Sequence, residues 1–305
     1  MWKYIALQAS LRTIALLPNR LLYQLMRLCA LLIYLFAPKT RRNVSANVTL
    51  VLGPGSSRAE IRKATRRIIY NATLYYVDLI RLPRASKKDL FERRIIYHGY
   101  DENLVPALAK GKGAILASCH FGNPEMAVQA CVPKGLEVFG LTEPLSPERL
   151  TRLVDRLRSS QGIVFAPAGV ANVRRAIKHL RNGHVVALMC DRDIRGPKAL
   201  LPLAGHQAEF PTGPIELAMR TGAVFIPTFS YRREGDKVEV FLEEPLPLIG
   251  DGKFQEDVQE NALRFLQRFE AHLKRDPSQW IVLESIWEEP AGSSSEMGSP
   301  ERLAV

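Results

Sequence analysis

The chain has 305 residues, 47% of them hydrophobic, which is enough for one large core or two small ones. Its formal net charge of +11 permits nucleic acid, an anionic membrane or an acidic ligand as a partner. The sequence carries no signature of a nucleic-acid-recognition module, so no nucleic-acid partner is expected. The cysteines form no CxxC pair and are predicted to be buried free thiols in a reducing compartment: Cys29, Cys119, Cys131 and Cys190.

Two apolar stretches open the chain, Trp2 to Leu17 and Leu21 to Phe36. Polar residues interrupt both, and each is shorter than the roughly 20 apolar residues of a spanning helix. Basic residues gather around them: Arg12, Arg20, Arg27, Lys39, Arg41 and Arg42. We therefore predict that residues 1–55 form a membrane-associating helical region on an anionic surface, either as helices lying in the interface or as one tilted anchor. The alternative is an ordinary helical hairpin packed on the rest of the protein.

The remainder of the chain alternates between apolar runs and helical periods. Ser57-Arg58-Ala59-Glu60 is a capping box that predicts a helix to about Ile80. Strands are expected at 113–118, 138–142, 163–166, 185–190, 223–231 and 237–242, the last two as a hairpin. Helices are expected at 104–110, 124–131, 147–159, 170–181, 214–220 and 254–274. This predicts an α/β domain over 56–288 with a mainly parallel central sheet flanked by helices, and a disordered tail over 289–305.

The most informative stretch is Ser118-Cys119-His120-Phe121-Gly122-Asn123-Pro124-Glu125. It follows a buried strand, and its Asn-Pro pair is typical of a helix N-cap and first helical residue. His120 is therefore expected on a turn at the carboxyl edge of the sheet, where open α/β folds bind ligands. An imidazole oriented there by a carboxylate can take a proton from a hydroxyl. Cys119 is expected to point into the core, because neighbouring strand residues alternate in direction.

This stretch resembles the His-x4-acid block of the bacterial lipid A biosynthesis acyltransferases and of their relatives that acylate phosphatidylinositol mannosides. Further blocks fit in the same order: Arg41-Arg42 with Asn47, Ala64 to Leu82, Glu143 to Gly162, Gly183 to Gly196, Phe210 to Pro214, and Asp276 to Trp280. The resemblance covers about residues 20 to 288. Two departures favour the phosphatidylinositol mannoside branch: Arg192 at the centre of the Asp-x-Asp block, and a non-basic ending from Trp280 to Trp287.

The resemblance implies an O-acyltransferase that moves a fatty acyl chain from acyl-CoA or acyl-ACP to a hydroxyl of a glycolipid. This chemistry needs no cofactor or metal beyond the acyl donor, and acyl carrier protein is a candidate partner. Such an enzyme is expected at the cytoplasmic face of the bacterial plasma (inner) membrane, either peripheral or with a single N-terminal anchor.

Three residues are candidates for catalysis. His120 is the predicted general base. Glu125, in the first turn of the following helix, could orient the imidazole or bind the acceptor. Asp191 ends the predicted strand 185–190 and lies at the same edge of the sheet, so it is a rival partner for the ring.

Five further residues are candidates for binding the substrates. Arg158 aligns with an arginine of the family, and both it and Arg192 could bind donor phosphate or the developing oxyanion. Asp193 completes the Asp-x-Asp block. Thr212 and Gly213 open a predicted helix, whose backbone N–H groups could receive an anion.

Two other functions remain open at this stage. Asp191-Arg192-Asp193 could hold a divalent ion against a nucleotide-sugar, as in metal-dependent glycosyltransferases, although no nucleotide-binding fingerprint accompanies it. A non-catalytic membrane lipid carrier would account for the basic charge and apolar helices, but it would leave His120, Glu125 and Asp191 unexplained.

Overall fold

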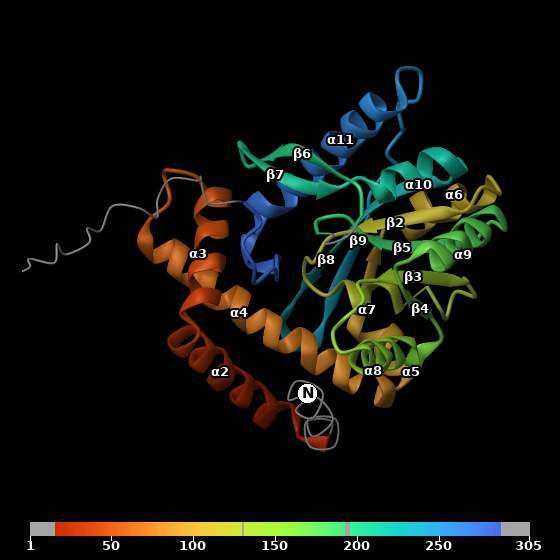
Figure 1. The fold of residues 1–305 in the computed structure, drawn as a ribbon. Helices are drawn as coiled ribbons and strands as arrows, with labels where there is room; N and C mark the ends of the chain where they lie inside the picture. Colours follow the sequence, from red (N-terminus) through yellow and green to blue (C-terminus); the bar gives the residue numbers. More distant parts are fainter. Residues whose placement is uncertain (1–15, 130, 193–195, 288–305) are drawn as a thin grey trace, which may run out of the picture.

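The computed structural model describes residues 16–129, 131–192 and 196–287. Within these, seven strands form one sheet in the order β1-β9-β8-β2-β5-β3-β4 (Figure 1). Its strands are β1 (Ile95–His98), β2 (Ala114–Ser118), β3 (Val138–Thr142), β4 (Val164–Pro167), β5 (Val185–Met189), β8 (Val224–Arg232) and β9 (Val238–Leu242). The strands from β8 to β4 in this order run parallel, while β9 pairs antiparallel to β8 and β1 runs parallel to β9. The predicted mainly parallel α/β fold is confirmed.

Helices cover both faces of the sheet (Figure 1). Those that precede the sheet are α2 (Asn19–Phe36), α3 (Pro38–Leu52) and α4 (Arg58–Arg81). Those that follow are α5 (Lys87–Asp89), α6 (Val105–Ala109), α7 (Pro124–Gln129), α8 (Glu148–Arg158), α9 (Val170–Arg181), α10 (Gly213–Thr221) and α11 (Phe254–Arg275). The predicted capping box opens α4: Ser57 Oγ accepts from the Glu60 N–H and the Glu60 carboxylate accepts from the Ser57 N–H.

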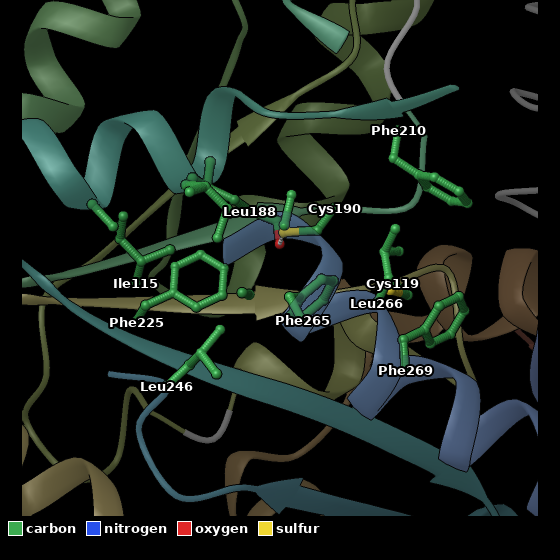
Figure 2. Close-up of a cluster of buried hydrophobic side chains, with 14 of the residues drawn as sticks. Ile115, Cys119, Leu188, Cys190, Phe210, Phe225, Leu246, Phe265, Leu266 and Phe269 are labelled. Carbon is green, nitrogen blue, oxygen red and sulfur yellow. Dashed lines mark hydrogen bonds between the residues drawn. The ribbon is translucent and has the colours of Figure 1, made fainter. Parts of the chain in front are cut away.

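The core has two layers because the central strands are buried on both sides. In β2, Ile115 and Ala117 join the cluster that faces α9, α10 and α11, whereas Ala114 and Leu116 join the cluster that faces α6 and α7. Figure 2 shows the first cluster, where side chains of the sheet meet those of α11. Burial on both faces explains why these strands are continuous apolar runs rather than alternating ones.

Two parts of the sheet structure were not predicted. One is β1, a strand of four residues at the sheet edge that follows a basic stretch. The other is a separate antiparallel hairpin, β6 (Lys198–Leu203) and β7 (His206–Pro211). Proline cannot donate to a ladder, so Pro202 and Pro211 argue against strands when the sequence is taken alone. The predicted hairpin across 234–236 is confirmed as β8 and β9.

The N-terminal helices pack on α4. Leu22 and Met26 of α2 cluster with Leu74 and Val77 of α4, and α3 packs through its own buried valines. In the described chain, no single helix has the length and composition to cross a membrane, although α2 and α3 together pass that test with a bend of 94° between them. The predicted apolar stretch Trp2 to Leu17 lies almost wholly outside the described residues, and the predicted disordered tail lies entirely outside them.

Candidate active site

The carboxyl ends of two adjacent strands bring the central pair of residues together. β2 and β5 are parallel neighbours, and their last residues, Ser118 and Met189, lie opposite each other. His120 and Asp191 each follow two residues later, and the Cys190 N–H donates to the Ser118 carbonyl at 2.7 Å. Residues that are 71 apart in sequence therefore meet, because the ends of parallel strands share one edge of the sheet.

Asp191 holds His120 through both its ring and its backbone. Oδ1 lies 3.0 Å from Nδ1 of the imidazole, and Oδ2 accepts from the His120 N–H at 2.9 Å. The indole N–H of Trp280 donates to Oδ2 as well, at 2.9 Å. An ionised carboxylate only accepts, so Nδ1 carries the proton and Nε2 keeps its lone pair. The carboxylate is fully buried, whereas the His120 side chain is 32% exposed.

Each member of the pair shifts the pKa of the other. Burial opposes ionisation of Asp191, but the charge of His120 and the hydrogen bonds from His120 and Trp280 prevail and lower its pKa. Burial likewise opposes protonation of His120, but the Asp191 charge and hydrogen bond outweigh it, so the pKa of the imidazole is raised above its ordinary value. Asp191 therefore favours the protonated form of the His120 ring.

The turn after His120 depends on Gly122 and Asn123. Gly122 has φ +68°, and a Cβ there would overlap the Ser230 carbonyl, so only glycine fits. The Asn123 side chain accepts from the Met126 N–H at 3.1 Å, which confirms the predicted cap of α7. Its amide also donates to the buried Asp78 of α4 at 2.6 Å, so α4 helps to fix the turn.

Glu125 does not contact the imidazole. Its carboxylate pairs with Nε of Arg158 at 2.7 Å and accepts from the Tyr75 hydroxyl at 2.7 Å. Arg158 also donates to the Tyr75 oxygen and lies 3.6 Å from Asp155. The Glu125 and Arg158 side chains are only 13% and 16% exposed, and desolvation is outweighed by the surrounding anions, so the pKa of Arg158 is raised. Of the two candidate carboxylates, Asp191 is therefore the one that orients His120.

The other predicted binding residues have different positions. Arg192 forms ion pairs with Glu143 and Glu284, and its charge opposes protonation of His120. Asp193 lies outside the described residues. Thr212 is buried, and its hydroxyl donates to Glu216 one turn into α10, which begins at Gly213. Among the described residues, no hydrogen bond or ion pair joins this helix start to the His120–Asp191 pair.

The C-terminal strap, residues 276–287, belongs to the site, although its residues were predicted only as a block of the family. Gln279 accepts from the Gly122 N–H, Trp280 donates to Asp191, and the Ile281 N–H donates to the His120 carbonyl. Asn47 of α3 and Asn71 of α4 donate to strap carbonyls at 2.7 and 2.9 Å. The strap was recognisable only as a family block, because the segment around Trp280 has no periodic pattern.

Cys119 lies in the core beside the site. Its side chain is fully buried among the residues of the first cluster, together with Cys190 (Figure 2). Burial raises the pKa of its thiol well above the ordinary value, and the nearby Asp191 charge adds to this. Both observations agree with the predicted packing role.

Comparison with known proteins places this geometry in context. The family model described as "Bacterial lipid A biosynthesis acyltransferase" matches residues 1–289. The chain is 31% identical over 219 residues to the "Phosphatidylinositol mannoside acyltransferase" of Mycobacterium tuberculosis (strain CDC 1551 / Oshkosh), covering 70% of this chain and 66% of that protein. It is 27% identical over 216 residues to the protein of that description from Mycolicibacterium smegmatis, covering 70% and 68%. The match thus spans just under two thirds of the M. tuberculosis protein.

Proposed function

The chain belongs to the bacterial lipid A biosynthesis acyltransferase family, and from this premise we propose that it acylates a hydroxyl of a glycolipid with His120 as the general base. The family assignment confirms the predicted resemblance and, with it, the acyltransferase class. The proposed acceptor is phosphatidylinositol mannoside-like, since the similar mycobacterial proteins carry that description. The proposed donor is acyl-CoA or acyl-ACP.

The proposed mechanism follows from the atoms around His120. Nε2 takes the proton of the acceptor hydroxyl as its oxygen attacks the thioester carbonyl, and Asp191 stabilises the resulting imidazolium. The tetrahedral intermediate then collapses, the C–S bond breaks, and the imidazolium returns the proton to the departing thiolate. The new ester and the free thiol account for every atom, and no covalent enzyme intermediate is needed.

The remaining predicted residues take supporting roles in this proposal. Glu125 positions the start of α7 through its ion pair with Arg158. Arg192 stands next to Asp191 in sequence and is partly exposed, so it could bind donor phosphate by exchanging its carboxylate partners for the phosphate. Thr212 and Gly213, at the N-terminus of α10, remain proposed anion ligands. Asp193 remains a proposed substrate-binding residue.

We further propose that the protein works at the cytoplasmic face of the bacterial inner membrane, and that the region 1–55 associates with this membrane. The support is the bent pair of apolar helices α2 and α3, together with the basic charge around them.

The His120–Asp191–Trp280 arrangement is the observation that carries the proposal, and replacing His120 tests it. The host lipids are analysed by mass spectrometry with the chromosomal copy intact or carrying His120→Ala. We expect one glycolipid to lose a single acyl chain. His206→Ala, which changes an exposed histidine of β7, is the matched control and should leave the lipids unchanged.

A second arm uses purified protein, acyl-CoA and phosphatidylinositol mannoside, with and without EDTA. We expect acyl transfer that is insensitive to EDTA and absent in His120→Ala. An unchanged lipidome with folded mutant at normal abundance, together with transfer by that mutant in vitro, would refute the assignment. Glycosyl transfer from a nucleotide-sugar that EDTA abolishes, without any acyl transfer, would favour a metal-dependent glycosyltransferase instead. Lipid binding without any transfer by the wild type would favour a carrier.

A further inference from the structure

The first 59 residues contain no acidic side chain, since Glu60 is the first carboxylate of the chain. Eight basic residues lie in the same segment: Lys3, Arg12, Arg20, Arg27, Lys39, Arg41, Arg42 and Arg58. They account for most of the formal net charge of +11, so the excess positive charge is concentrated at this end of the sequence. Such a one-sided distribution creates a local field that attracts anions.

The fold gathers part of this charge into one hollow, which we call the arginine groove. It is a cavity of about 440 Å³ between α2, α3 and α4. The residues that define the groove are Tyr34, Arg41, Arg42, Arg58 and Arg62. An adjoining hollow of about 790 Å³ shares Arg62 and is also basic.

Within the described residues, the arginines of the groove have no carboxylate partner. The ion pairs of the described chain include none of the four. Arg41 donates to the Tyr34 carbonyl at 3.1 Å and lies over the Tyr34 ring, which holds one side of the groove in place. Elsewhere the chain pairs its partly buried arginines, as Arg158, Arg192 and Arg232 illustrate. Unpaired guanidinium groups facing one hollow repel each other, and a phosphate would relieve that repulsion by bidentate hydrogen bonding.

An apolar surface lies on the same helical unit. We call it the leucine stripe of α2: Leu21, Leu25, Leu28, Leu32 and Leu35. These residues recur every three or four positions, so they form one continuous face, and each is between 36% and 51% exposed. The face packed on α4 is a different one, formed by Leu22, Met26 and Ala30. No described residue covers the stripe, and an exposed apolar face of this length favours a lipid environment.

We propose that the arginine groove binds the phosphate groups of anionic phospholipids while the leucine stripe lies among their acyl chains. The biological meaning of this proposal rests on the proposed function. The proposal extends that function by naming the residues that bind the membrane and the side of the molecule that faces it. Figure 1 shows α2 and α3 at one side of the molecule, with α9 at the other. The charge of the groove complements that of an anionic leaflet and selects it over a neutral one, whereas the leucine stripe adds affinity for either leaflet.

The groove is linked to the site through the strap. Asn47, on the same helix as Arg41 and Arg42, holds the Glu284 carbonyl, and the Glu284 carboxylate pairs with Arg192. A membrane bound at the groove would therefore lie on the side of the molecule whose helices support the strap next to the His120–Asp191 pair. This is the side from which a membrane-embedded acceptor would approach.

The test is co-sedimentation of the full chain with vesicles, without acyl donor, so that its outcome does not depend on catalysis. One set of vesicles is phosphatidylcholine alone and the other is phosphatidylcholine with phosphatidylglycerol. We expect the wild type to prefer the anionic vesicles, and the variant Arg42→Gln/Arg58→Gln/Arg62→Gln to bind them about 100-fold more weakly. His120→Ala should bind as the wild type does, whatever becomes of the proposed reaction.

The control removes the same charge from the opposite side of the molecule. Arg174→Gln/Lys178→Gln/Arg181→Gln changes exposed residues of α9 and should leave vesicle binding within about twofold of wild type. Equal losses in the two triple variants would mean that net charge, not the groove, drives binding, and would overturn the proposal. Full vesicle binding by the groove variant would also overturn it. If calorimetry with CoA then found CoA binding lost in that variant, the groove would be a donor site.

Discussion

Two carboxylates at the same edge of the sheet face cations of different kinds. Asp191 is fully buried against His120, whose charge comes and goes with a proton, whereas Glu125 lies against Arg158, whose charge is permanent. The Asp191 carboxylate therefore changes the free energy of a proton transfer. The Glu125 carboxylate instead belongs to an ion pair whose two charges stay the same during the reaction. The comparison teaches that the partner of a carboxylate, more than its place near the reaction, decides whether it can act in catalysis.

The largest effect is expected from removing the Asp191 charge. Asp191→Asn keeps the shape of the side chain but removes the attraction for the imidazolium and permits the wrong ring tautomer. We expect kcat to fall by about 10²–10⁴-fold, measured as acyl transfer from acyl-CoA to phosphatidylinositol mannoside. Glu125→Gln should lose far less. Equal losses of kcat in the two variants, with both proteins folded, would break the comparison.

The pH dependence sharpens the same contrast. The base must be neutral to act, and Asp191 raises the pKa of His120 above 6.5, so the wild-type rate should rise with pH through a value above 6.5. In Asp191→Asn, burial and the Arg192 charge lower the pKa of the ring against only the smaller contribution of Glu125, so the residual activity should reach its plateau at lower pH. Glu125→Gln should shift the profile less, because Glu125 is a smaller contributor to that pKa. An unshifted profile in Asp191→Asn would contradict this assignment.

Glu125 should matter mainly for stability. Glu125→Gln leaves the guanidinium of Arg158 largely buried with only the more distant Asp155 as a counter-ion. We expect the free energy of unfolding to fall by about 3 kcal/mol, measured by urea denaturation.

The matched control for this stability effect removes both charges. Glu125→Gln/Arg158→Met should recover part of the lost stability, because no unpaired buried charge remains. If the double variant lost more free energy of unfolding than Glu125→Gln and Arg158→Met lose together, the ion pair would not be the cause.

The sequence could place the two carboxylates but not choose between them. Strand ends put His120 and Asp191 at one edge, and the Asn123-Pro124 cap put Glu125 in the first turn of a helix, as the structure confirms. Spacing along the chain does not say where a side chain points. Glu125 is instead held by Arg158, at the end of α8, and by Tyr75 of α4.

Elements with regular patterns were predictable, and those without them were not. The two-sided burial of β2 and β5 leaves a plain apolar run in the sequence. The hairpin β6–β7 carries prolines, which conceal it. The strap is irregular, and its indole reaches Asp191 from 89 residues away, so only a tertiary contact reveals that Trp280 belongs to the site.

The smallest effect is expected from removing the indole N–H of Trp280. This change isolates the single hydrogen bond that Trp280 donates to Asp191. Trp280→Phe keeps an aromatic ring against Phe269 and Trp287 but removes the N–H that donates to Asp191. One of the donors that keep the pKa of Asp191 low is then missing, while His120 still contacts Oδ1. We expect kcat to fall about tenfold, with KM for the acyl donor unchanged, in steady-state assays. Trp287→Phe is the matched control, because its indole donates to the His206 carbonyl away from the His120–Asp191 pair, and it should leave kcat within about twofold. A change confined to KM in Trp280→Phe would mean that the strap shapes a binding surface instead of tuning the carboxylate that orients the base.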